Sequence, residues 1–327
     1  MSDDQIAVRD GVRAFCEGRL ASDRLSDFEG ELDREFWREL AELGAFALRR
    51  SELEGGLGLG MAEAVLVFAE LGRRLAPGPT IWTHLSAGLI EGAAEGEVVV
   101  GGVEAIRAAK GPHLVASLES LDVLLVLSED GVAKILAAEL EAEPTAQAFD
   151  PLNPVSVVEG LPAGEVVGDA ELAHRMWLEG VVLSAAQMLG MSEATLDLAN
   201  HYAKTREQFD RPIGSFQAIK HMLADMYCRQ EVARASAYAA GVTIDTPSVG
   251  DVAHAARAAK LTCGKAAMKN ARACIQIHGG MGYTWEVPAH YYLKRSWMLE
   301  NSFGTTEEHA DELGSLIADS LDRPTVV

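Results

Sequence analysis

Apolar residues recur at helical spacing through the first part of the chain. They stand three or four positions apart, which places them on one buried helical face. Three stretches are predicted helices on this pattern: 3–25, 34–48 and 61–75. A glycine-rich break at 55–60 precedes the third stretch, and Pro77 and Pro79 end it. We therefore expect an N-terminal helical domain over residues 1–85.

The pattern then changes to short apolar runs separated by turn-forming residues. Such runs, rich in Val, Ile and Leu, are typical of β-strands. Four of them stand out: 97–103, 121–127, 132–136 and 155–158. They predict a compact antiparallel sheet or barrel, which forms a shortened β domain over residues 86–170.

Long helical patterns return after residue 170. The predicted helices are 172–204, 214–243, 249–277, 287–298 and 305–321. The third is rich in alanine, and small residues let helices pack closely as in a bundle. The expected fold class is mainly α: a helical N-terminal domain, a reduced central β domain and a C-terminal four-helix-type bundle over 171–327.

The charge limits which kinds of partner the protein can bind, and the cysteine content indicates its cellular compartment. The chain carries 28 Lys and Arg against 49 Asp and Glu, a formal net charge of −21. This excludes nucleic acid and an anionic membrane surface as partners, because both need a basic face. The four cysteines show no CxxC spacing. With no signal-peptide pattern and no apolar run near ~18 residues, we expect a cytoplasmic protein.

The connection between the first two long bundle helices carries candidate phosphate ligands. Its sequence is AKTREQFDRPIGSFQ, residues 203–217. Arg206 and Arg211 stand in this connection, and a planar guanidinium can clamp a phosphate through two hydrogen bonds. The same spacing equally allows both arginines to pair with neighbouring carboxylates.

A second candidate lies where the alanine-rich helix ends, in IQIHGGMGYTWE, residues 275–286. Three glycines in four positions let backbone N–H groups approach a ligand's phosphates. A simple helix cap and turn is the alternative. The earlier glycine run at 55–60 matches neither the dinucleotide fingerprint nor a P-loop.

Together these segments resemble the acyl-CoA dehydrogenase family. The stretches YAKTREQFDRPIGSFQAIKHMLADMY and QIHGGMGYTWEVPAHYYLKR look like its two C-terminal signatures, and SELEGGLGLGMAEAVLVFAELGRRLAP resembles the end of its N-terminal domain. The resemblance implies a flavoprotein that removes two hydrogens across the α,β bond of an acyl-CoA. A carboxylate takes the α proton and the hydride goes to FAD. The family assembles as a dimer of dimers, with each FAD bound across two subunits.

The resemblance also implies which residues contact FAD. The adenosine and pyrophosphate half would contact three residues: Arg206, Phe209 and Gln217. The FAD held mainly by the neighbouring subunit would be reached by Gln276, Gly279 and Gly280. Thr305 matches a family position close to FAD.

The chain departs from the family pattern where the reaction occurs. The β region has no counterpart of the TEPxAGSD-like loop or of the Trp-Ile-(Thr/Ser) strand that hold the flavin ring. The usual catalytic glutamate is replaced by Phe303, and Glu300 lies about one helical turn away. Some family members carry the base on the first long helix instead. That position is Gly180 here, and Glu179, one residue before it, becomes the candidate base.

These features lead to one principal hypothesis and two alternatives. The principal hypothesis is a subunit of an α2β2 acyl-CoA dehydrogenase, as in actinobacterial steroid side-chain degradation. A paralogous partner would supply the flavin-ring pocket and the base, and an electron-transfer flavoprotein would accept the electrons. The alternatives are a self-sufficient enzyme that uses Glu179 and a non-catalytic scaffold.

A di-iron bundle needs two Glu-x-x-His motifs. We find one, Glu171 with His174, and therefore expect no metal.

Overall fold

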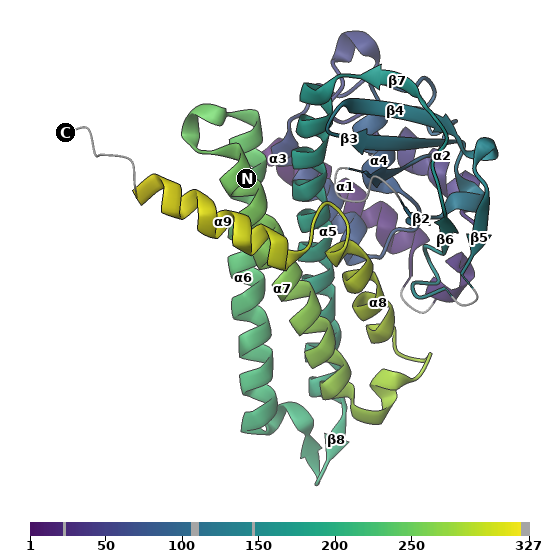
Figure 1. Cartoon of the computed structure of the whole chain (residues 1–327). Coiled ribbons are helices and arrows are strands. Elements are labelled where there is room, and N and C mark those ends of the chain that lie inside the picture. Colours follow the sequence, from purple (N-terminus) through teal and green to yellow (C-terminus); the bar gives the residue numbers. More distant parts are fainter. Residues whose placement is uncertain (22–23, 106–110, 146–147, 322–327) are drawn as a thin grey trace.

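A single long helix, α5 (Ala170–Thr205), separates a layer of strands from a bundle of helices (Figure 1). The computed structural model describes residues 1–21, 24–105, 111–145 and 148–321. Within these ranges the order is helical, then β, then helical. The predicted mainly α fold class is confirmed, with the β portion small and central.

The N-terminal helices begin at the caps that the sequence offers. Their bounds are α1 Asp3–Arg19, α2 Arg34–Glu42, α3 Met61–Arg73 and α4 Thr80–Ser86. Ser2 forms a capping box with Gln5, and the Asp33 carboxylate accepts from the first turn of α2. Helix α1 ends earlier than predicted; of the predicted remainder, residues 22–23 lie outside the described ranges. The sequence pattern missed α4, because Pro79 reads as a helix stop but here precedes a helix start.

The strands form two sheets rather than the predicted single antiparallel one. Their bounds are β1 Val100–Glu104, β2 His113–Ala116, β3 Val123–Ser128, β4 Gly131–Leu136, β5 Ala142–Pro144, β6 Val155–Val158 and β7 Glu165–Gly168. One sheet has the order β1-β3-β4-β7 and the other β2-β6-β5. Strands β1 and β3 run parallel, which corrects the antiparallel prediction. The chain passes through β2 between them, and such a crossover permits parallel pairing.

The C-terminal helices lie close to their predicted positions. After α5 come α6 Gln217–Asp245, α7 Val252–His278, α8 Ala289–Glu300 and α9 Thr306–Leu321. A short hairpin, β8 Glu207–Gln208 with β9 Arg211–Pro212, joins α5 to α6 at the lower end of the bundle in Figure 1. None of the described helices combines the length and hydropathy needed to cross a membrane.

Helices α3 and α5 approach each other closely because both carry glycine at their crossing. A Cβ atom on Gly190 would lie 1.7 Å from the carbonyl oxygen of Ala69. A Cβ atom on Gly72 would lie 2.1 Å from the carbonyl oxygen of Gln187. The backbones therefore touch, and this contact joins the N-terminal helices to the bundle.

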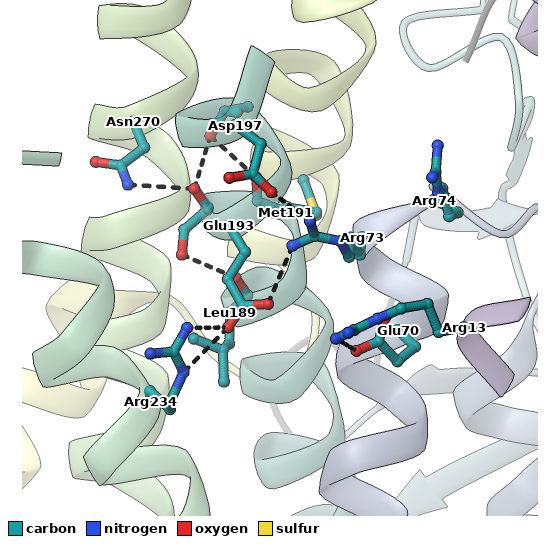
Figure 2. Close-up of polar contacts among 12 residues, drawn as sticks. Arg13, Glu70, Arg73, Arg74, Leu189, Met191, Glu193, Asp197, Arg234 and Asn270 are labelled. Atoms are coloured by element: carbon teal, nitrogen blue, oxygen red, sulfur yellow. Dashed lines mark hydrogen bonds and ion pairs between the residues drawn. The ribbon is translucent and has the colours of Figure 1, made fainter. Parts of the chain in front are cut away.

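Ion pairs extend this junction beyond the glycine contact (Figure 2). Arg13 of α1 pairs with Glu70 of α3 at 2.5 Å. Arg73 of α3 and Arg234 of α6 both pair with Glu193 of α5, at 3.4 and 2.7 Å. Each pair is partly buried, so each holds two helices in one orientation better than an exposed pair does. Four helices are thereby tied to one another.

The helix crossing makes a specific stability prediction. We expect Gly190→Ala to lower the free energy of unfolding by about 1–3 kcal/mol or more, because an added Cβ forces the packed backbones apart. Gly18→Ala is the matched control: Gly18 is also helical, but its Cβ position meets no atom within 4 Å. The control should be neutral or stabilising by up to about 1 kcal/mol. Urea unfolding measures both; equal effects would contradict this account of the crossing.

Candidate active site

A cleft lies between the strands and the turn that joins α8 to α9. Its volume is about 430 Å³, and its walls come from β1, β2, the α8–α9 turn and the start of α9. A smaller cavity of about 90 Å³ adjoins it and extends toward α5 and the start of α4. Trp82, Gly102 and Met298 line both cavities. This is where the central domain meets the C-terminal helices.

Two aromatic rings stand between these cavities and the bundle. The Phe303 ring is 1% exposed and lies 4.9 Å, centroid to centroid, from the Trp82 ring. Each ring packs over a glycine: a Cβ on Gly180 would lie 2.2 Å from Phe303, and a Cβ on Gly102 would lie 2.2 Å from Trp82. The ring stack therefore fills the position where the family resemblance places a catalytic carboxylate.

A buried lysine holds the turn that carries Phe303. Lys260 of α7 is 0% exposed, and its Nζ donates to the carbonyl oxygens of Leu299 and Ser302, both at 2.6 Å. It also donates to the Ser184 hydroxyl of α5 at 3.2 Å. A cation at this point neutralises the negative end of α8. Burial lowers the pKa of Lys260 to about 8.

Glu104, which no sequence motif singles out, contacts the turn through its carboxylate. Glu104 ends β1 and lines the 430 Å³ cleft. Its Oε1 accepts from the backbone N–H of Phe303 at 2.5 Å. The only available sequence signal was its position directly after the apolar run 97–103. Its contact depends on the long-range packing of β1 against the α8–α9 turn.

Glu179, the candidate base, is held by an ion pair across the domains. Its two carboxylate oxygens accept from the guanidinium of Arg49 at 2.8 and 2.9 Å. The residue is 9% exposed and does not line either of the cavities described above. Arg49 follows α2 in the N-terminal region, so this pair joins that region to α5. The structure thus gives Glu179 a cationic partner at bonding distance.

Thr305 lines the cleft and also caps a helix. Its backbone N–H and its hydroxyl both donate to the Glu308 carboxylate, at 2.8 and 2.9 Å. The Glu308 N–H in turn donates to the Thr305 hydroxyl at 3.2 Å. This reciprocal pattern is a capping box at the start of α9. Thr305 therefore faces the cleft with a fixed orientation.

The candidate residues of the α5–α6 connection lie together at the lower end of the bundle (Figure 1). Arg206, Phe209 and Gln217 are all exposed, Phe209 by 84%. Within the described part of the chain, neither Arg206 nor Arg211 has a carboxylate within 4.0 Å. The Arg211 guanidinium lies over the Phe216 ring, 4.1 Å from its centroid. The alternative, that these arginines pair with neighbouring carboxylates, is therefore not realised.

The second glycine-containing segment reaches the same end of the bundle. Gln276 is exposed on α7, and Gly279 ends that helix with φ +61°. The Cβ positions of Gly279 and Gly280 have no atom within 4 Å. Tyr283 and Trp285 follow and are 81% and 68% exposed. The Gly279 N–H donates to the carbonyl oxygen of Gln276, while the exposed aromatic rings beside the open glycine surface are suited to contact a large ligand or a second protein.

Thr305 is separated from these two segments by the length of α8. That helix has 12 residues and spans about 18 Å. The seven candidate cofactor residues therefore form two groups, one at the end of the bundle and one in the cleft.

Two family models match the chain. The acyl-CoA dehydrogenase N-terminal domain matches residues 2–95, and the acyl-CoA dehydrogenase C-terminal domain matches residues 178–316. Acyl-CoA dehydrogenase IpdE2 of Mycobacterium tuberculosis (strain ATCC 25618 / H37Rv) is 33% identical over 294 residues, which cover 86% of this chain and 85% of that protein. The chain therefore belongs to the acyl-CoA dehydrogenase family. The matched ranges leave out residues 96–177, which hold all the strands of the two central sheets.

Solved structures share the whole fold. The ChsE4-ChsE5 complex from Mycobacterium tuberculosis has a TM-score of 0.84 at 24% identity, covering 99% of each chain. A variant of the Tcur3481-Tcur3483 steroid ACAD has a TM-score of 0.84 at 23% identity, covering 98% of this chain and 99% of that one. At this level of identity the likeness establishes the fold.

Family membership makes the protein an oxidoreductase that acts on acyl-CoA, with FAD as its cofactor. The residues at the end of the bundle fit part of that cofactor. Arg206 and Arg211, which have no carboxylate partner among the described residues, offer the donors that a pyrophosphate needs, and Gly279 and Gly280 leave space for its approach. Phe209 offers an exposed ring face on which an adenine can stack.

The buried lysine makes a prediction about pH. Its pKa is about 8 in the folded protein and about 10.4 in an unfolded chain. Between these values the unfolded state binds the proton and the folded state does not, so stability rises with pH. We expect the unfolding free energy of the wild type, relative to Lys260→Met, to rise by about 2 kcal/mol between about pH 7.5 and 9.5.

Chemical denaturation across this pH range provides the measurement. Lys265→Met, on the exposed face of the same helix, is the matched control. A wild-type advantage over Lys260→Met that stays constant with pH would contradict the buried, partly neutral lysine.

Proposed function

We propose that this chain is one subunit of a heteromeric acyl-CoA dehydrogenase whose paralogous partner supplies the flavin-ring pocket and the catalytic base. One observation carries the proposal: the candidate FAD residues at the bundle end are exposed, while buried Phe303 stands where the family resemblance places the base. FAD, when bound, supplies the hydride acceptor. This chain then contributes binding and orientation, and the partner removes the α proton.

The state of the carboxylates supports placing the base on the partner. A general base must reach its proton at about 3 Å. Phe303 has no titratable group, and Glu179 is engaged by Arg49 through both oxygens. Glu104 reaches the turn but accepts from the Phe303 N–H. Glu179 and Glu104 therefore already have donors, and Glu300 accepts from Thr306 through Oε1, while its buried Oε2 has no partner among the described residues.

The separation of the cofactor residues supports a shared FAD. The bundle-end residues are exposed, so a second subunit can cover them together with the adenosine half of the cofactor. Exposed aromatic side chains of the size of Phe209, Tyr283 and Trp285 commonly mark such contacts. The ChsE4-ChsE5 structure, which shares the fold, is itself a complex of two different chains by its title.

For the substrate class we propose a steroid-derived acyl-CoA, with an electron-transfer flavoprotein as acceptor. A structural neighbour with a TM-score of 0.84 is titled a steroid ACAD. The reduced β portion leaves a wide cleft beside α8, which suits a bulky acyl group. The proposed place of action is the cytoplasm.

Co-expression tests the proposal directly. The chain is purified alone and with each acyl-CoA dehydrogenase paralogue encoded beside it, and flavin absorbance and dye reduction with acyl-CoA are measured. We expect FAD and activity only in a complex, and a lower FAD content when this chain carries Arg206→Ala. Arg24→Ala, in an exposed pair with Asp27, is the matched control.

The alternatives give different results in the same assay. A yellow, active complex made of this chain alone would contradict the proposal. A Glu179→Gln variant that keeps FAD but loses dye reduction would favour the self-sufficient enzyme. A complex without FAD under every pairing would favour the scaffold.

A further inference from the structure

Helix α7 carries only positive charge within a strongly acidic chain. Between Val252 and His278 it contains no Asp or Glu, although the chain as a whole has a net charge of −21. The charged side chains of this helix are therefore all cations, and they are Arg257, Lys260, Lys265, Lys269 and Arg272.

Two of these cations have partners inside the fold. Lys260 is buried and holds the α8–α9 turn, and Arg257 pairs with Glu312 of α9. Helix α9 crosses α7 here, over its first half (Figure 1). The cations beyond the crossing are exposed, and no carboxylate of the described residues lies within 4.0 Å of them. We call them the basic stripe, which consists of Lys265, Lys269 and Arg272.

The spacing places the basic stripe on one face of α7. Its members stand four and three positions apart, which is the separation of neighbours on a helix surface. Gln276, four positions after Arg272, is also exposed and continues this face to the candidate cofactor residues at the end of the bundle. From Lys265 to Gln276 the face is about 17 Å long. A second helix lying along α7 would contact these positions, because contacts between packed helices repeat about every 3.5 residues.

The helix dipole does not account for this charge. Cations stabilise the negative end of a helix, but the effect fades within the last turn. Helix α7 ends at His278, and all three members of the basic stripe precede its last turn. Like charges that are neighbours on one helix face also repel one another. An anionic partner along this face would replace that repulsion by attraction.

The shape of the basic stripe fits an acidic helix better than a phosphate or a nucleic acid. A phosphate is held by donors that converge on it, whereas the stripe spreads its charges over about 10 Å along one line. Nucleic acid needs an extended basic surface, and the chain at −21 does not offer one. An acidic helix presents a few carboxylates at the same spacing and needs no basic surface outside the stripe.

A second copy of this chain has the wrong charge for this face. Identical subunits commonly meet through the same patch on both, related by a twofold axis. The basic stripe would then face the basic stripe of the other copy. Like charges across an interface are unfavourable and so suppress the wrong partner. A paralogue with Asp or Glu on the facing helix has the complementary charge.

We propose that the basic stripe of α7 docks an acidic helix face of the paralogous subunit, and that this charge match selects the heteromer over a pair of identical chains. The proposal rests on the proposed function, because it takes that paralogue as the partner. The docked helix lies beside Gln276 and so reaches the candidate cofactor residues. Docking therefore brings the partner to the open half of the FAD site.

Charge reversal in the co-expressed complex tests the proposal. The variant is Lys265→Glu with Lys269→Glu, which leaves Arg272, the member nearest the cofactor residues, unchanged. Mass photometry follows dissociation of the purified complex on dilution at low and at high NaCl concentration. At low salt the variant should weaken the complex about tenfold or more, because two attractions become repulsions. The wild-type complex should weaken several-fold at high salt, and the variant should not.

Two further pairs of substitutions separate docking from general effects of charge. Arg38→Glu with Arg175→Glu is the matched control: both arginines are exposed, on α2 and α5, and neither has a carboxylate within 4.0 Å among the described residues. This control should dissociate as the wild type does. Lys265→Gln with Lys269→Gln removes the attraction without adding repulsion. It should give an intermediate loss of affinity, and it serves as the test where circular dichroism shows that the Glu variant is unfolded.

Three results would overturn the proposal. These are equal dissociation of the stripe variants and the control, a wild-type complex that salt does not weaken, and loss of FAD from a variant complex that stays intact. The last would assign the basic stripe to the cofactor. In each case the wild-type complex and its FAD remain, so the heteromeric function stands. A wild-type chain that forms no complex with any paralogue would instead contradict both proposals.

Discussion

The fold depends on the close packing of other helices and strands against its longest helix, α5. Helix α5 is buried along most of its length and contacts α3, α4, α6, α7 and α8 as well as β3 and β4. Gly190 lets the α3 backbone touch it, and Gly180 gives the Phe303 ring its place. The same helix carries Glu179 and Glu193, which pair with arginines from two other helices and from the turn after α2. One helix therefore positions the domains and the site together.

This packing fixes the position of the α8–α9 turn. Lys260 fixes the carbonyl end of α8, and the Glu104 carboxylate accepts from the Phe303 N–H on the other side. The Phe303 ring and the Trp82 ring then pack over two glycines. An aromatic ring thus stands where the resemblance to the family places the base. A turn of this kind agrees with our proposal that another subunit abstracts the proton.

Much of the fold followed from periodicity, and the failures have physical causes. The long helices of the bundle were predicted nearly to their ends, because their apolar faces repeat over many turns. The direction of the strands was not predicted correctly. Strands β1 and β3 are parallel, and an apolar run contains no local signal for the direction in which it pairs. The short strands β2, β5 and β7 were missed. Their exposed apolar residues, such as Leu114 and Val166, give no clear alternation.

The sequence predicted members of the candidate site only where they are neighbours along the chain. The motifs at 203–217 and 275–286 located the bundle-end group, and the motif around Phe303 located the turn. The partners that determine chemistry lie far apart in sequence. Arg49 and Glu179 are 130 positions apart, and Glu104 and Phe303 are 199 apart. Such pairs become visible only when tertiary packing brings the side chains together.

The central claim is that this chain holds the adenosine half of a cofactor whose ring lies in another subunit. A cryo-electron microscopy map of the FAD-loaded complex tests it most directly. We predict adenosine and pyrophosphate density beside Arg206, Phe209 and Gly280, with the ring enclosed by the partner and next to a partner carboxylate. Ring density between β1 and the Phe303 turn of this chain, in a complex of identical subunits, would contradict the account.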